Sequence, residues 1–227
     1  MRSERRLIAG PAGRIEAVLD WPDASPPAGV AHVAHPHPLY GGSLDNKVVS
    51  TLARAFTSLG WLSVRSNFRG VGATEGEHDD GRGELEDMMH LIEQVVWLPH
   101  GAAMPLALAG FSFGSFVIAN AADRLGKQGK PARHLILVGA AAGKWPMPQV
   151  DAGALLIHGE QDETILLTDV FAWARNYEVP VVVIPGADHF FHRRLTLLKT
   201  IVTRYLLGAE ASDHNPAGNR KESDEPR

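Results

Sequence analysis

A serine between two glycines is the residue of this chain best suited to nucleophilic chemistry. The stretch Gly110-Phe111-Ser112-Phe113-Gly114 follows a short apolar run and precedes a segment with helical periodicity. A serine at such a strand-to-helix turn has a strained backbone, and the flanking glycines avoid a steric clash. The N-terminus of the following helix directs free N–H groups and a positive dipole end at the same place. The pattern therefore predicts a nucleophile whose product is an oxyanion.

Two further residues complete the chemistry that a serine nucleophile requires. A serine hydroxyl is a weak nucleophile at neutral pH and needs a base within hydrogen-bond reach. His189 lies in the loop after the last predicted strand, downstream of Ser112. The base in turn needs a carboxylate to orient it. Asp162, which follows the preceding predicted strand, is the favoured acid, and Glu160 and Glu163 are its competitors.

Strands and helices alternate along most of the chain, after a predicted N-terminal hairpin. The hairpin comprises residues 5–9 and 14–21, and the expected strands are 30–34, 61–67, 106–109, 135–139, 154–158 and 181–184. Helices are expected at residues 46–59, 84–98, directly after Ser112, at 168–176 and at 191–207. This order predicts an α/β fold whose mostly parallel sheet has helices on both faces. Ser112, Asp162 and His189 each follow a strand, so they should converge at one edge of the sheet.

Composition limits the remaining possibilities. The 227 residues, 44% of them hydrophobic, suffice for one sizeable core, and we expect a single domain over residues 1–207 with a disordered polar tail over 208–227. The formal charge of −4 has no basic stripe that would favour nucleic acid. The absence of cysteine excludes disulfides and a thiolate nucleophile. No leader or membrane span is evident, so we expect a cytoplasmic protein.

The motifs together resemble the α/β-hydrolase superfamily. Ser112, Asp162 and His189 occur in that superfamily's chain order, and His158-Gly159-x-x-Asp162 resembles its acid loop. Phe68-Arg69-Gly70-x-Gly72-x-Thr74-x-Gly76 is similar to its arginine-glycine loop after the fourth strand. Asn67 departs from the superfamily, in which many relatives carry Asp.

A longer motif resembles a narrower group. His35-Pro36-His37-Pro38-Leu39-Tyr40-Gly41-Gly42-Ser43, followed by Asn46-Lys47, is similar to a small bacterial subgroup of lidless serine hydrolases related to dienelactone hydrolases. Dienelactone hydrolases use a cysteine nucleophile, so their substrate does not carry over to this chain.

An oxyanion requires two N–H donors. One should be the backbone N–H of Phe113, directly after the nucleophile. The other should come from the loop after residues 30–34, in which Pro36 and Pro38 have no N–H. The remaining candidates are His37, Leu39 and Tyr40. Register with the superfamily favours His37, with Leu39 second.

Several residues near these motifs have a competing interpretation. His35 and His37 could ligate a metal together with His78, Asp79 and Asp80, but the prolines break strand regularity and Ser112 already supplies a nucleophile. We therefore expect neither a metal nor an organic cofactor. Arg69 is expected to pair with a carboxylate or with loop carbonyls, and the methionines Met88 and Met89 are expected in the core.

The link over residues 140–151, where a hydrolase lid usually arises, is short and contains two prolines. The site should therefore be open, and Leu39, Tyr40 and Trp145 are expected as its apolar walls. We expect a serine carboxylesterase that acts on a small ester, as a monomer or a homodimer, without nucleic acid or membrane. The alternatives are an amidase, peptidase or thioesterase with the same residues, and a hydrolase fold retained as a binding module.

Overall fold

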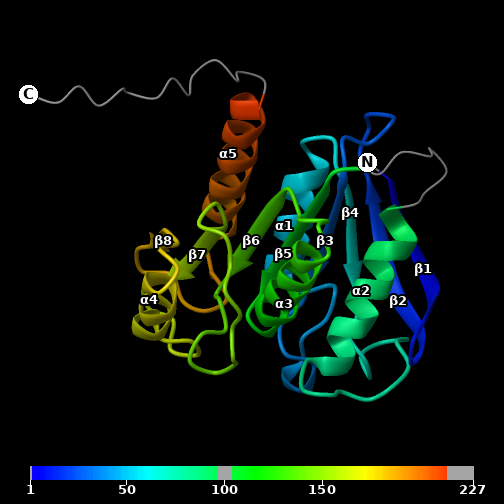
Figure 1. Cartoon of the computed structure of the whole chain (residues 1–227), viewed down its shortest axis with the longest axis horizontal. Coiled ribbons are helices and arrows are strands. Elements are labelled where there is room, and N and C mark those ends of the chain that lie inside the picture. The colour runs from blue at the N-terminus through cyan, green and yellow to red at the C-terminus, as the bar shows by residue number, and fades with distance from the viewer. Residues whose placement is uncertain (1, 97–103, 214–227) are drawn as a thin grey trace, which may run out of the picture.

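The sheet has eight strands, and the computed structural model describes residues 2–96 and 104–213. The strands are β1 (Arg2–Gly10), β2 (Gly13–Trp21), β3 (Val30–Ala34), β4 (Leu62–Ser66), β5 (Leu106–Phe111), β6 (His134–Val138), β7 (Leu155–Gly159) and β8 (Val181–Ile184). Their order across the sheet is β1-β2-β4-β3-β5-β6-β7-β8. β1 and β2 pair antiparallel, as do β2 and β4, whereas all other neighbours are parallel. The predicted hairpin and mostly parallel sheet are confirmed (Figure 1).

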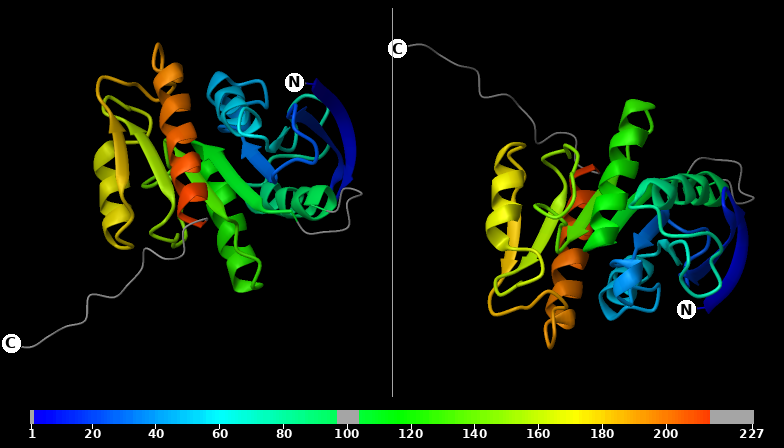
Figure 2. Two further views of the ribbon diagram at one scale, coloured as in Figure 1. Left: turned by 90° about the horizontal axis from the view of Figure 1, so that it is seen from above. Right: turned by 90° about the horizontal axis from the view of Figure 1, so that it is seen from below.

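In the part of the chain that the structure describes, five α-helices cover both faces of this sheet. They are α1 (Lys47–Thr57), α2 (Arg82–Val96), α3 (Phe113–Lys127), α4 (Leu167–Arg175) and α5 (Leu195–Asp213), and a short 3-10 turn, η1, spans Pro38–Tyr40. Residues of α1 and α5 share one buried cluster, and residues of α2, α3 and α4 share another (Figure 2). The carboxyl ends of the parallel strands therefore meet at one edge, between two packed layers.

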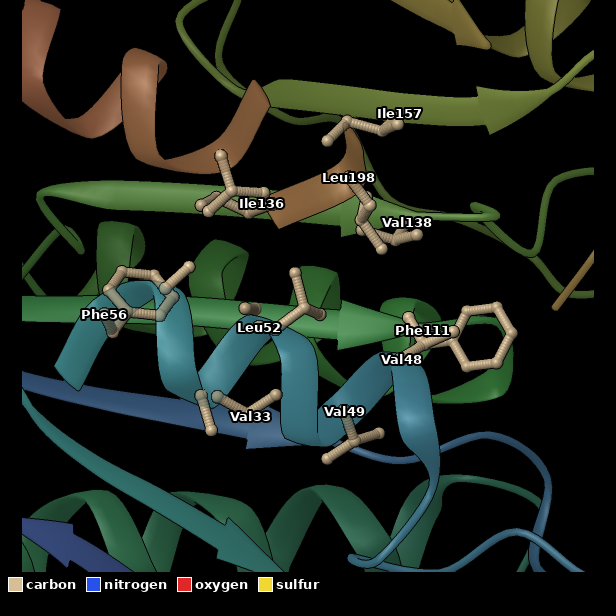
Figure 3. Packing of buried hydrophobic residues seen from close by; sticks show 14 of the residues in the cluster. Val33, Val48, Val49, Leu52, Phe56, Phe111, Ile136, Val138, Ile157 and Leu198 are labelled. Carbon is tan, nitrogen blue, oxygen red and sulfur yellow. The ribbon is translucent and has the colours of Figure 1, made fainter. Parts of the chain in front are cut away.

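On one face of the sheet, buried side chains of the strands pack against α1 and α5 (Figure 3). Val33 and Ile136 project from β3 and β6 towards Leu52, Phe56 and Leu198 of the two helices. All five side chains are fully buried. Burial of each large apolar side chain contributes roughly 1.5–3 kcal/mol, so this contact firmly positions the strands that carry the site.

The predicted start of α1 at Asn46 is explained by capping. The Asn46 side chain accepts hydrogen bonds from the N–H groups of Val48 and Val49, at 2.9 and 3.4 Å. This interaction satisfies two donors that have no partner within the helix. The chain then reverses at Gly60, whose φ of 89° is the left-handed conformation expected there.

The prediction for α5 was wrong at both ends. The helix begins at Leu195 instead of 191, because Phe191 and Arg193 have φ values of 54° and 59° that a right-handed helix excludes. It ends at Asp213 instead of 207, so residues 208–213 are not part of a disordered tail. Trp61 Nε1 donates to Glu210 Oε1 at 3.3 Å and secures this extension. The rest of the predicted tail, 214–227, and the predicted end of α2 at 97–98 lie outside the described residues.

The link between β6 and β7 contains no helix, so this link forms no helical lid over the sheet edge. In the described part of the chain, no helix is long and apolar enough to cross a membrane. Met88 and Met89 are buried, as predicted.

Candidate active site

Ser112 occupies the sharp turn between β5 and α3. Its φ of 55° and ψ of −122° are strained values for a residue with a side chain. A Cβ atom on Gly110 would collide with the Gly114 carbonyl, and one on Gly114 would lie 2.5 Å from the carbonyl oxygens of Ala34 and His35. Glycine at these two positions therefore lets the turn close and lets α3 start directly against the end of β3.

The structure brings together the three residues that the sequence selects for catalysis. His189 Nε2 lies 3.0 Å from Ser112 Oγ, and His189 Nδ1 lies 2.6 Å from Asp162 Oδ2. The other carboxylate oxygen of Asp162 accepts the N–H groups of Thr164 and Ile165, at 2.9 and 2.8 Å. With Asp162 accepting from Nδ1–H, the Nε2 atom of His189 is free to accept the serine proton.

The competing acids have other roles. Glu160 Oε2 accepts the N–H of Gly186 at 2.8 Å. Asp188 accepts from His192, with 2.5 Å between Oδ2 and Nδ1. Glu163 is exposed, and no contact of its side chain with His189 is found among the described residues. Asp162, which is only 4% exposed, is thus the carboxylate that orients this imidazole.

His158 is a second buried imidazole beside Asp162, and sequence reasoning assigned it no role of its own. Its Nε2 atom lies 2.9 Å from the Ile165 carbonyl oxygen and 3.4 Å from Asp162 Oδ2. Burial lowers the pKa of His158, so the ring stays neutral and donates its Nε2–H to Ile165. It therefore fixes the loop whose N–H group binds Asp162.

Hydrogen bonds separate the three candidates for the second oxyanion donor. The Leu39 N–H donates to His37 Nδ1 at 3.3 Å, and the Tyr40 N–H donates to the His37 carbonyl at 3.2 Å. Within residues 2–96 and 104–213, the N–H groups of His37 and Phe113 have no hydrogen-bond partner. The rings of these two residues lie 4.9 Å apart, at the start of α3. His37 and Phe113 therefore present the free donors.

His35 fixes the peptide unit that carries the His37 N–H. Its Nε2 atom accepts the Phe68 N–H at 2.9 Å, so Nδ1 carries the hydrogen and donates to the Pro36 carbonyl at 2.6 Å. Burial lowers the pKa of His35 to about 4, which keeps the ring neutral near pH 7. The Pro36 carbonyl and the His37 N–H belong to one amide and point in opposite directions. His35 thus orients the His37 N–H without touching the site.

Two clefts lie beside the triad, and Glu163 and Thr164 line both of them. The first, here called the aromatic cleft, has a volume of about 480 Å³, and its lining includes Ser112, His37, Tyr40, Phe113, Lys144 and Trp145. The second, here called the histidine cleft, has a volume of about 690 Å³, and its lining includes Asp162, His189, Phe190, Glu160, Glu163 and Asp188. Of the three residues expected as apolar walls, Tyr40 and Trp145 line the aromatic cleft, whereas Leu39 lines neither cleft. Tyr40 is 87% exposed and Leu39 is 69% exposed.

Comparison with known proteins assigns the family. No family model matches the chain. A lidless α/β serine hydrolase of Xanthomonas campestris, XC6422, is 34% identical, with a TM-score of 0.82 over 91% of this chain and 94% of that one. The chain belongs to the lidless α/β serine hydrolases. An α/β serine hydrolase homologue of Coxiella burnetii is 38% identical, with a TM-score of 0.79 over 89% and 97% of the two chains.

A curated relative of the hydrolase is the uncharacterized protein RP471 of Rickettsia prowazekii. The two chains are 28% identical over 226 residues, which cover 91% of this chain and 90% of the relative. The similarity thus extends over nearly the whole length of both chains.

The remaining motif residues of the hydrolase support loops around the site. Arg69 pairs with Asp87 through two hydrogen bonds of 2.8 and 2.9 Å, as predicted. Asn67, the departure from the superfamily pattern, accepts the Leu44 N–H at 2.8 Å and donates to Glu16 at 2.7 Å. Among the residues that the structure describes, no group of three or more His, Asp or Glu side chains could hold a metal ion.

Proposed function

We propose that this hydrolase is a serine carboxylesterase in which Ser112, His189 and Asp162 form the catalytic triad. The observation that carries the proposal is the continuous hydrogen-bonded chain from Ser112 Oγ through His189 to Asp162, with distances of 3.0 and 2.6 Å. All three side chains are at least nine-tenths buried, so their electrostatic interactions are little weakened by water. Ser112 lines the aromatic cleft, so a substrate in this cleft can reach its Oγ.

The first half of the reaction acylates the serine. Ser112 Oγ attacks the ester carbonyl carbon while His189 Nε2 takes the hydroxyl proton. The carbonyl oxygen becomes an oxyanion, which the N–H groups of Phe113 and His37 bind. When the tetrahedral intermediate collapses, the bond to the alcohol oxygen breaks, and His189 gives its proton to that oxygen.

The second half returns the enzyme to its starting state. His189 takes a proton from water, and the resulting hydroxide attacks the acyl-serine carbonyl. Collapse of the second intermediate releases the carboxylic acid, and Ser112 regains its proton from His189. Asp162 stabilises the imidazolium in both halves. The ester and one water molecule are consumed, and the alcohol and the carboxylic acid are released.

The histidine cleft favours neutral esters over polyanionic thioesters. Glu160, Glu163 and Asp188 line this cleft beside His189, where the leaving group must be protonated. A carrier with several phosphates would place negative charge against these carboxylates, which raises the free energy of its transition state. A neutral alcohol incurs no such cost.

Turnover of three substrates with the same acetyl group tests this assignment. We expect kcat/KM to be highest for 4-nitrophenyl acetate, and at least about 100-fold lower for acetyl coenzyme A and for 4-nitroacetanilide. Raising the ionic strength should increase kcat/KM for acetyl coenzyme A relative to that for 4-nitrophenyl acetate, because salt screens the charge repulsion. It should not change the corresponding ratio for 4-nitroacetanilide, which is uncharged. A higher kcat/KM for the thioester or the anilide would instead assign the protein as a thioesterase or an amidase.

A further inference from the structure

The wall of the aromatic cleft is a row of three rings. The His37 ring lies 4.7 Å from that of Tyr40 and 5.7 Å from that of Trp145, measured between centroids. All three residues line the cleft beside Ser112. The residues of the wall belong to two loops, those after β3 and β6. Both loops leave the same edge of the sheet (Figure 1).

Trp145 is held firmly at the end of this row. Phe116 of α3 stacks against it with a centroid distance of 5.3 Å and an interplanar angle of 27°. Phe113 contacts it edge-on at 4.9 Å. In the described structure Phe116 is not among the residues that line the cleft, so it supports Trp145 from behind. A ring fixed in this way presents a surface at little cost in conformational entropy.

The position of His189 decides which part of an ester meets this wall. His189 protonates the leaving oxygen, so the alcohol must lie on the His189 side of Ser112. Of the described residues, those that line the histidine cleft include His189 but not Ser112, and those that line the aromatic cleft include Ser112 but not His189. The donors that bind the oxyanion, on His37 and Phe113, also border the aromatic cleft. The acyl group therefore lies in the aromatic cleft.

We propose that the aromatic cleft selects esters whose acyl group carries a planar aromatic ring, bound against Tyr40 and Trp145. The inference deepens the proposed function and rests on it. A flat ring interacts with the quadrupoles of the wall in addition to burying apolar area, whereas a saturated ring of the same size only buries area. The cleft volume of about 480 Å³ is suited to one ring on a short linker. A long alkyl chain would extend from the open cleft into water and gain little from burial.

The test compares kcat/KM for two esters within each protein variant and uses their ratio. The 4-nitrophenyl esters of phenylacetic and cyclohexylacetic acid share a leaving group, and a methylene isolates the carbonyl from either ring. In the wild type we expect kcat/KM for the phenylacetyl ester to exceed that for the cyclohexylacetyl ester about tenfold, the effect of one or two aromatic contacts. The ratio should fall towards one in Tyr40→Leu and Trp145→Leu. Tyr40→Phe should keep it, because the ring remains.

A partly misfolded variant loses activity towards both esters by the same factor, so the ratio of their kcat/KM values is unchanged. The ratio therefore reports the aromatic preference even in such a variant. Trp21→Leu, which removes a tryptophan from the distant β2 strand, is the control and should keep the ratio. A wild-type ratio near or below one, or a higher kcat/KM for the octanoyl ester than for the phenylacetyl ester, would overturn the proposal.

A second pair tests the orientation. Benzyl acetate and cyclohexylmethyl acetate carry the ring on the alcohol, and we expect their rate ratio to be the same in the wild type and in Tyr40→Leu. A change in this ratio, without one in the acyl pair, would place the alcohol in the aromatic cleft and overturn the inference. Hydrolysis of 4-nitrophenyl acetate without aromatic preference would reject only this inference. Inertness towards every ester would reject the proposed function.

Discussion

Asp162→Asn is expected to lower kcat about ten-thousand-fold while the protein stays folded. The asparagine oxygen can still accept the N–H groups of Thr164 and Ile165, which the carboxylate now accepts at 2.9 and 2.8 Å. Its NH₂ group would then face His189 Nδ1, where the carboxylate oxygen lies at 2.6 Å. A donor at that place forces the hydrogen of His189 onto Nε2, so the imidazole cannot take the proton of Ser112.

Steady-state hydrolysis of 4-nitrophenyl acetate measures this loss, and thermal unfolding checks the fold. The matched controls are Glu163→Gln and Asp188→Asn, which neutralise the other acids near His189. Each should lower kcat by less than about tenfold, since neither side chain binds the imidazole of His189. If Glu163→Gln were as damaging as Asp162→Asn, the assignment of the acid would be wrong.

Substitution of His35 is expected to have the second large effect on kcat. Two variants, each of which keeps a polar atom near only one of the two ring nitrogens, separate the roles of these nitrogens. His35→Gln keeps an acceptor near the position of Nε2 for the Phe68 N–H but loses the donor to the Pro36 carbonyl. The His37 amide is then no longer oriented, and we expect kcat to fall about 10² to 10³-fold, as when one oxyanion donor is lost. His35→Asn keeps a donor near the position of Nδ1, and its kcat should stay within about tenfold of the wild type.

For stability we expect the reverse order: His35→Asn, the more active variant, should be the less stable one. His35→Asn leaves the buried Phe68 N–H without its acceptor, which costs about 1–3 kcal/mol of the free energy of unfolding. Urea denaturation together with kcat and KM therefore separates the positioning role from a structural one. Equal losses of kcat in both variants, in proportion to lost stability, would mean that His35 only holds the fold together.

Local signals in the sequence predicted the strand-to-helix turn that carries Ser112. The turn at Ser112 can be recognised from the five residues 110–114, which contain two glycines, together with the apolar strand before them and the helical periodicity after them. Chain order alone placed Asp162 and His189 at the same sheet edge. The helix α1 was predictable from Asn46, whose capping depends only on the next three residues.

Features that depend on contacts between distant segments could not be predicted. The end of α5 is secured by Trp61 through Glu210, 149 residues further along the chain. Its start depends on positive φ values at Phe191 and Arg193, residue types that rarely adopt them. The hydrogen bond of the Leu39 N–H to His37 Nδ1, in contrast, is local to the η1 turn, and there the sequence already favoured His37 over Leu39. The support of Asp162 by His158 likewise needs the folded loop after β7.

Labelling with a fluorophosphonate, read by intact mass, tests the central claim most directly. The reagent reacts much faster with a serine that a base has activated than with an ordinary serine, and the product resembles the tetrahedral intermediate. The account predicts that the wild type gains one label per chain, located on Ser112, and loses esterase activity in proportion. Ser112→Ala should gain no label and should not hydrolyse 4-nitrophenyl acetate. An unlabelled and inactive wild type, or equal labelling of Ser112→Ala, would contradict the account.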